Sequence, residues 1–315
     1  MLFPASQKGV ALITALLIVA LATVISVELS TRLQLDIRRT SNIIASDQAL
    51  SYMIEAEYWS RRILKADRKD NNYDHLDEDW AMEIPPLPVE GGSIQGKLSD
   101  LQACFNLNSL YQGGKVNTLA QDHFKRLMQH LATPPGTDLS QAIIDWIDAD
   151  LNTTVPDGAE DNYYLNMERS YRNANQPLQS MSELRLIKGF EDDAIIQQTK
   201  DWLCAFGPAA KINVNTASVE VLESLAAGIS PTKAADIVAN RQTTPYETMN
   251  DFLTINTLST VITAATGLSA ISVSSDYFLL ETEANIGQAR TLMYSIIHRD
   301  NDGKTQVIAR SQGAY

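Results

Sequence analysis

The most constraining feature of this chain is an uncharged, strongly apolar run close to its N-terminus. Residues 10–27, VALITALLIVALATVISV, hold only three polar side chains, those of Thr14, Thr23 and Ser26, before the first acidic residue at Glu28. At 1.5 Å per helical residue this run reaches about 27 Å, close to the roughly 30 Å of a bilayer's hydrocarbon core. The run therefore predicts a helix that crosses a membrane once.

The residues before the run, MLFPASQKG, favour a particular kind of membrane segment. An ordinary secretory signal carries its cleavage site after the apolar stretch, whereas here Lys8-Gly9 stands directly before it. This arrangement resembles the leader of type IV prepilins. The resemblance implies peptidase cleavage between Gly9 and Val10, with the apolar helix kept in the mature chain. A plain single-pass anchor is the alternative that the apolar run leaves open.

The charges that flank the apolar run favour one orientation in the membrane, and the prepilin resemblance favours the other. Arg32, Arg38 and Arg39 follow the run, and a positive-inside count would place the bulk of the chain in the cytoplasm. Glu28 and Asp36 dilute that cluster, however. The prepilin resemblance implies a single-pass protein of the bacterial inner membrane, with the bulk of the chain in the periplasm, and we expect that arrangement.

Net charge and cysteine content limit the possible functions. The 315 residues carry a net charge of −13, which argues against nucleic acid as a partner, because such binding depends on neutralising phosphates with Lys and Arg. Cys104 and Cys204 lie beyond the membrane segment, each just before one of two similar segments. In an oxidising compartment they can pair, and we expect a Cys104–Cys204 disulfide. Two buried free thiols are the alternative.

The helix is expected to continue well past the membrane. Residues 28–66 contain no Gly or Pro, and apolar residues recur there at roughly helical spacing. A single helix from Val10 to about Ala66 would be about 85 Å long. Its second half would need a packed partner, and we expect that partner to be an antiparallel sheet. We interpret the charged stretch 65–79 and the proline-rich Ile84–Pro88 as loops.

Strands are expected on both sides of a long intervening region. They cover 92–101, 272–283, 288–299 and 305–311, with a strong hairpin signal at Asp300-Asn-Asp-Gly303. We predict an α+β fold: a pilin-like long N-terminal helix packed on an antiparallel sheet, with a large all-helical inserted domain. The predicted segments are a leader (1–9), a transmembrane helix (10–27), a pilin-like α/β domain (28–104 and 271–315) and an insertion (105–270). We expect the insertion to consist of two helix-hairpin-helix-like halves, about 105–204 and 205–270.

The insertion contains a faint internal repeat. Phe105-Asn-Leu-Asn-Ser109 matches Ile212-Asn-Val-Asn-Thr216, and the final hydroxyl residue of each is expected to cap a following helix. The second copy resembles a helix-hairpin-helix unit, with its hairpin at Gly228-Ile229-Ser230. Residues 209–255 hold three basic and five acidic side chains, which is the wrong balance for a phosphate backbone. We interpret this half as a helical packing module.

Together these segments resemble one family, the K-type minor pseudopilin of bacterial type II secretion, also called general secretion pathway protein K. The resemblance covers the leader, the anchor, the long helix, the CFNLNSL and INVNTAS segments and the acidic segment between them. It implies a structural subunit that caps the pseudopilus tip together with the I-type and J-type minor pseudopilins. It also implies processing by the prepilin peptidase and anchoring in the inner membrane.

Thr14 is one departure from ordinary pilins that supports the K type. It is the fifth residue after Gly9, where most pilins have Glu, and the K type is known for lacking this Glu. A carboxylate in lipid is costly and needs a partner, so its absence suits a first subunit at the tip. The simpler interpretation is a helix residue whose hydroxyl bonds a carbonyl of the preceding turn.

An acidic segment is the candidate chemical site. Residues 127–168 contain no Lys or Arg. Crowded carboxylates need a counter-charge, and oxygen-rich loops suit Ca²⁺, which takes 6 to 8 oxygen ligands. The family is also reported to bind calcium. A solvated acidic loop is the alternative, and the spacing is not that of an EF-hand. The candidate ligands are Asp145, Asp148, Asp150, Asp157, Glu160 and Asp161.

No catalytic constellation stands out. The chain has four His residues without metal-ligand spacing, no glycine-rich phosphate loop and no nucleophile motif. Two classes of function therefore remain. The first is a structural assembly subunit of the secretion pseudopilus, which we favour. The second is a membrane-anchored periplasmic calcium-dependent enzyme that would use the acidic loop and would need an open coordination position.

Overall fold

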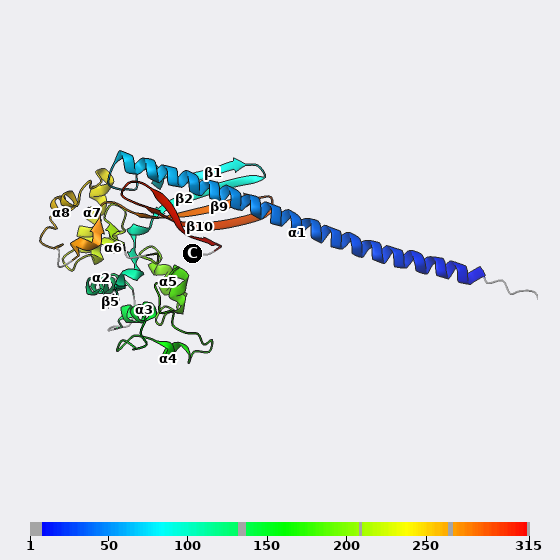
Figure 1. Cartoon of the computed structure of the whole chain (residues 1–315), viewed down its shortest axis with the longest axis horizontal. Coiled ribbons are helices and arrows are strands. Elements are labelled where there is room, and N and C mark those ends of the chain that lie inside the picture. Colours follow the sequence, from blue (N-terminus) through cyan, green and yellow to red (C-terminus); the bar gives the residue numbers. More distant parts are fainter. Residues whose placement is uncertain (1–7, 132–136, 208–209, 264–266, 314–315) are drawn as a thin grey trace, which may run out of the picture.

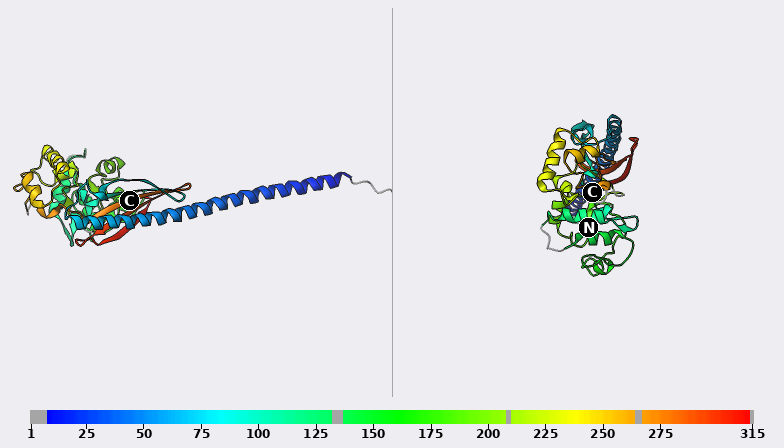
Figure 2. Two further views of the ribbon diagram at one scale, coloured as in Figure 1. Left: turned by 90° about the horizontal axis from the view of Figure 1, so that it is seen from above. Right: turned by 90° about the vertical axis from the view of Figure 1, so that its left-hand side faces the viewer.

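The fold is dominated by one helix that extends far beyond the rest of the molecule (Figures 1 and 2). The computed structural model describes residues 8–131, 137–207, 210–263 and 267–313. Helix α1 (Lys8–Asp70) has 63 residues, which is about 95 Å at 1.5 Å per residue. It begins and ends within four residues of the prediction. Most of the expected leader lies outside the described residues.

The segment of α1 expected to lie in lipid, residues 10–27, is exposed along its whole length. Its large apolar side chains face outward; Leu17 and Ile18, for example, are each 67% exposed. Among the described residues, α1 is the one helix long and apolar enough to cross a membrane. The hydroxyl of Thr14 donates to the carbonyls of Val10 (3.1 Å) and Ala11 (3.0 Å). Such bonds hide the hydroxyl from lipid without any partner from another helix.

The second half of α1 packs on a five-stranded antiparallel sheet, as predicted. The strand order is β1-β2-β9-β10-β11. Alternate residues face α1, so that Ala49 and Met53 of α1 contact Ala284 and Met293, which lie opposite the helix. The strands are β1 (Ile84–Val89), β2 (Gly92–Asp100), β9 (Tyr277–Ile286), β10 (Ala289–Arg299) and β11 (Thr305–Gln312).

Strand β1 corrects one expectation. The proline-rich segment interpreted as a loop is an edge strand that pairs with β2, with an irregular register between Ile84 and Leu87. Pro85, Pro86 and Pro88 have no N–H to donate, and an edge strand tolerates this because one side of it pairs with no other strand. The hairpin between β10 and β11 is confirmed, with Gly303 at a positive φ of 77°.

The insertion leaves the sheet after β2 and returns before β9. It is mainly helical, as predicted, but it also contains three pairs of two-residue strands, and the expected strand 272–283 is split into β8 and β9. Its elements in chain order, after the short η1 (Asp79–Ala81) that precedes the sheet, are η2 (Leu101–Ala103), β3 (Phe105–Asn106), η3 (Leu107–Leu110), β4 (Tyr111–Gln112), β5 (Lys115–Val116), α2 (Thr118–Met128), α3 (Leu139–Ile147), α4 (Asp161–Tyr164), η4 (Met181–Leu186), α5 (Asp193–Thr199), β6 (Leu203–Cys204), β7 (Ile212–Asn213), α6 (Val219–Ser224), α7 (Pro231–Thr243), α8 (Met249–Ile255), η5 (Leu268–Ala270) and β8 (Ile271–Ser272).

The faint repeat seen in the sequence is a real structural repeat. In the first half, the side chain of Asn108 donates to Leu178 O (2.9 Å) and accepts from Leu178 N (2.8 Å). In the second half, Asn215 makes the same pair of bonds with Tyr246, both at 2.9 Å. The residues after Leu178 and Tyr246 then form matching capping boxes at the start of η4 and α8. Each Asn thus ties the start of its half to a later capped helix.

The expected capping role of Ser109 and Thr216 is wrong. Asn106 is the N-cap of η3 and accepts from Asn108 N at 3.1 Å, and Asn213 makes the same turn bond with Asn215 N at 2.9 Å. The helix after the second copy, α6, is capped by Ser218. Asparagine competes well with hydroxyl residues for this role because its side-chain oxygen reaches a backbone N–H two residues on.

A buried guanidinium joins the end of α1 to the sheet. Arg299 is fully buried, donates to Asp67 at 2.6 Å and forms a second ion pair with Asp74. The backbone carbonyl of Asp74 accepts from Asn213, the first Asn of the second repeat, at 3.1 Å. Buried polar contacts therefore join α1, the sheet and the insertion at this one junction.

Candidate functional site

The acidic segment folds into a loop at the end of the insertion farthest from the sheet (Figure 1). Helix α3 begins at the N-cap Asp138, whose side chain accepts from Ser140 N. The helix ends at Asp148, which has extended backbone angles. The chain then loops out and returns at Glu160, the N-cap position of α4. The helix end and the returning segment thereby bring together acidic residues that are twelve positions apart.

Three of the six candidate ligands come together. Asp148, Asp150 and Glu160 each place a carboxylate oxygen within 4.8 Å of the others. Asp148 is 6% exposed and Glu160 is 1% exposed, while Asp150 is exposed. Asp148 Oδ1 and Glu160 Oε1 are buried and lack a hydrogen-bond partner among the described residues. Buried unpaired carboxylate oxygens are costly, so this donor set fits a hard cation such as Ca²⁺.

The raised pKa values of the clustered carboxylates also show that the site lacks a positive charge. Burial first, and the neighbouring carboxylates second, raise the pKa of Glu160 to about 7. Burial first, and the charge of Asp150 second, raise the pKa of Asp148 to about 6. Without a cation, the site therefore binds protons more tightly than an exposed carboxylate does.

The other three candidates hold the loop in place. The carboxylate of Asp145 accepts from Thr154 N at 3.0 Å, and the backbone of Gly158 lies so close to it that an added Cβ would be 2.2 Å from Asp145 Oδ2. Asp157 accepts from Asp138 N at 2.8 Å. Asp161 accepts from Asn173 N at 3.0 Å. Their carboxylates are committed to backbone donors, so we assign them a supporting role.

Two residues at this site escaped the sequence analysis. The side chain of Asn173, which is 8% exposed, donates to Glu160 Oε2 at 2.7 Å and to the backbone carbonyl of Asp145. Lys188 Nζ reaches the loop at Gly158 O, 3.2 Å away. Both lie outside the base-free stretch 127–168, and the sequence carried no periodic or motif signal for them.

A second acidic cluster is not a metal site. Asp67, Asp74 and Glu78 also lie within 4.8 Å of one another. Here Arg299 already supplies the positive charge to both aspartates. The carboxylate of Glu78 accepts from the indole of Trp80 at 2.6 Å. This cluster is an internal ion-pair network.

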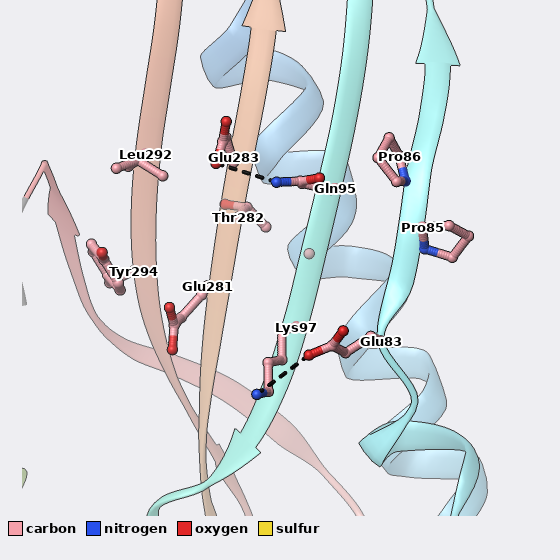
Figure 3. A pocket seen from close by; sticks show the side chains of 11 residues that line it. Glu83, Pro85, Pro86, Gln95, Lys97, Glu281, Thr282, Glu283, Leu292 and Tyr294 are labelled. Atoms are coloured by element: carbon pink, nitrogen blue, oxygen red, sulfur yellow. Dashed lines mark hydrogen bonds and ion pairs between the residues drawn. The ribbon is translucent and has the colours of Figure 1, made fainter. Parts of the chain in front are cut away.

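The open face of the sheet carries a wide, polar hollow of about 430 Å³ (Figure 3). Lys97 reaches Glu83 at 3.5 Å, and the amide of Gln95 donates to Glu283 at 3.2 Å. These side chains pair with one another across neighbouring strands, as expected for the solvated face of an antiparallel sheet. We assign no ligand to it.

Cys104 and Cys204 form a disulfide, with the sulfurs 2.11 Å apart and the Cα atoms 5.9 Å apart. Next to the disulfide, β3 and β6 pair as parallel strands, Phe105 with Leu203 and Asn106 with Cys204. Gly9 and Val10, the expected cleavage position, lie in the first turn of α1.

Comparison with known proteins decides the family. Two family models with the description type II secretion system (T2SS), protein K, match residues 103–208 and 212–274. A type II secretion system protein K from Pseudomonas aeruginosa is 34% identical over 98% of this chain and 93% of its own length. The chain belongs to the type II secretion system protein K family. Its relative from Klebsiella pneumoniae is 31% identical over 98% of this chain and 97% of that protein.

The fold agrees with this family. The chain resembles a chain from the crystal structure of the GspK-GspI-GspJ complex of the enterotoxigenic Escherichia coli type 2 secretion system. The TM-score is 0.77 at 29% identity, covering 88% of this chain and all of that one. The resemblance drawn from the sequence is therefore confirmed, as is the long helix packed on an antiparallel sheet with a helical insertion. Members of this family are minor pseudopilins, which are structural rather than catalytic proteins.

Proposed function

We propose that this chain works in the tip complex of a type II secretion pseudopilus, together with an I-type and a J-type minor pseudopilin. It would start or cap the pseudopilus that exports folded proteins across the outer membrane. The observation that carries the proposal is the match of 88% of the chain to a chain of the GspK-GspI-GspJ complex. Helix α1 would anchor it in the inner membrane after prepilin peptidase cleavage behind Gly9, with the bulk in the periplasm.

Thr14 supports a position at the tip. Its hydroxyl is satisfied by carbonyls of its own helix, so it needs no partner from a subunit above it. A carboxylate at this depth would need such a partner.

Copurification tests the assembly. The full chain, extracted in detergent with tagged I-type and J-type partners, is expected to elute as one complex. Separate elution of all three proteins would contradict the proposal. Thr14→Glu should leave this complex intact but reduce pseudopilus assembly in cells, because it introduces a carboxylate that lacks its partner.

We further propose that Asp148, Asp150 and Glu160 hold Ca²⁺. The metal would supply the positive charge that the cluster lacks. Support comes from the two unpartnered buried oxygens, one on Asp148 and one on Glu160. The alternative of a calcium-dependent enzyme is disfavoured by the structural role of the family. A calcium-bound crystal structure separates the two, because an enzyme site needs an exchangeable water facing a substrate cleft.

A further inference from the structure

Helix α1 leaves part of its own face of the sheet uncovered. It packs mainly over β9 and β10, where Phe278, Ala284 and Ile297 are fully buried. On the same face of β1, Leu87 is 45% exposed, and Ile94 of β2 is only partly buried. Apolar side chains on a helix-covered face are normally removed from water. The β1–β2 part of this face is therefore incomplete.

The uncovered strip forms an apolar groove of about 220 Å³ beside α1. Tyr52 and Trp59 of α1 form one wall, and Leu87 and Ile94 form the other. Trp59 is 46% exposed, which is unusual for so large an apolar side chain. Ser60, which also lines the groove, has a buried hydroxyl without a partner among the described residues. The groove has the composition of a binding surface rather than of a solvated face.

The size of the strip matches one helix. Neighbouring strands lie about 4.8 Å apart, so β1 and β2 present a strip roughly 10 Å wide. A helix with its side chains is about 10–12 Å in diameter, and packed helices lie 8–10 Å apart. Addition of a strand to the edge is disfavoured, because Pro85, Pro86 and Pro88 occupy the edge strand β1. A partner must therefore bind through side chains.

The orientation and charge of the groove identify the partner. The groove is lined by α1 residues from Tyr52 to Ser60, so it follows the helix axis. Helix α1 leads from there into the membrane-spanning segment (Figure 1). Glu55 lines the groove and Glu90 follows β1, and both are exposed and form no ion pair among the described residues. We propose that the groove receives an amphipathic helix of another subunit anchored in the same membrane. Its apolar side would contact Trp59 and Leu87, and a basic side chain would lie near Glu55.

This inference rests on the proposed tip complex and assigns a surface to it. Two variants block the groove without removing a core side chain. Leu87→Glu places a charge on its exposed wall. Gly96→Ile fills its floor, since an added Cβ there would have its nearest neighbour at an ordinary 3.4 Å. The matched control is Ile308→Glu on β11, at the opposite edge of the sheet, because Ile308 is 43% exposed and lies outside the groove.

The assay is copurification of the full chain with the I-type and J-type partners, with each variant's fold checked by circular dichroism. Both groove variants should lower recovery of the complex about tenfold or more, and the control should recover as much as the wild type. Equal recovery of folded Leu87→Glu and the wild type would overturn the groove and leave the tip complex standing. Failure of the wild type to form any complex would overturn both.

Photo-crosslinking identifies the occupant. Benzoylphenylalanine at Leu87 should crosslink to a helical segment of one partner, whereas the same probe at Ile308 should not. A crosslink from position 87 to a second copy of this chain, or to a non-helical segment of a partner, would overturn the proposal.

Discussion

Glu160→Gln separates a built metal site from a solvated acidic loop. Glu160 is 1% exposed, and its Oε1 lacks a partner while its Oε2 accepts from Asn173. Its pKa is raised from the model-compound value of 4.5 to about 7, first by burial and then by neighbouring carboxylates. Gln keeps the shape and the acceptor for Asn173, but it has no charge to bury and cannot act as an anionic ligand.

The magnitude follows from the difference in pKa between folded and unfolded protein. A rise from 4.5 to about 7 corresponds to about 3 kcal/mol, an order-of-magnitude value. Because the folded pKa is raised, this contribution to stability is complete below about pH 4.5 and is lost as pH rises through about 7. At pH 8 without metal, the wild type should therefore be less stable than Glu160→Gln by about 3 kcal/mol.

Calcium should remove most of this difference in stability. Binding to the folded state alone adds about 2.7 kcal/mol when free metal is a hundredfold above Kd. For a chain of this size, 1 kcal/mol shifts Tm by roughly 2 °C. In chelator at pH 8 the variant should melt about 6 °C above the wild type, and Ca²⁺ should raise the wild type by about 5 °C and the variant very little. Mg²⁺ should substitute poorly, because it demands tighter octahedral geometry.

Thermal melts of the full chain in detergent, followed by circular dichroism, measure these shifts. Glu168→Gln is the matched control, since it makes the same chemical change at an exposed position of the same acidic stretch. It should behave as the wild type under both conditions. If the wild type melts at the same temperature in chelator and in Ca²⁺, and Glu160→Gln does not raise Tm in chelator, the metal-site reasoning is refuted.

Three further predictions test other parts of the chain. Gly9→Val should block cleavage of the leader, as mass spectrometry of the membrane-extracted protein would reveal; a wild type that keeps its initiator methionine contradicts the leader assignment. Cys104 and Cys204 should be unreactive in the denatured, unreduced protein, and Cys104→Ser should cost up to about 4–5 kcal/mol in denaturant titrations by loop entropy; two free thiols would refute the pairing. Arg299→Met should cost about 3–5 kcal/mol because it strands buried carboxylates, whereas Arg290→Met, in an exposed pair, should cost less than about 1 kcal/mol in the same titration.

The elements with strong periodic signals could be predicted from the sequence. The apolar run and the Gly-free, Pro-free stretch after it placed α1 within a few residues of its observed ends. The alternating segments and the Asp-Gly turn placed β10 and β11. The sequence did not predict strand β1, because its three prolines are a strong loop signal. Prolines are tolerated there only because β1 lies at the edge of the sheet.

The candidate site was predictable only in part. The lack of bases and the density of carboxylates located the loop, but not which oxygens converge. Asp145 and Asp157 look equivalent to Asp148 in the sequence, yet backbone donors of the folded loop engage them. The role of Asn173 depends on a tertiary contact across 28 residues to the Asp145 carbonyl, which no local pattern encodes.

The Cys104–Cys204 disulfide has a topological consequence for the acidic loop. The two cysteines are 100 positions apart, so the disulfide closes the first half of the insertion into a ring, and the acidic loop lies on the side of this ring farthest from the sheet. If loss of metal loosens the loop, the disulfide still holds β3 and β6, at the two ends of the ring, beside the sheet. A protease that cuts once inside the ring should leave the two fragments joined until reductant is added.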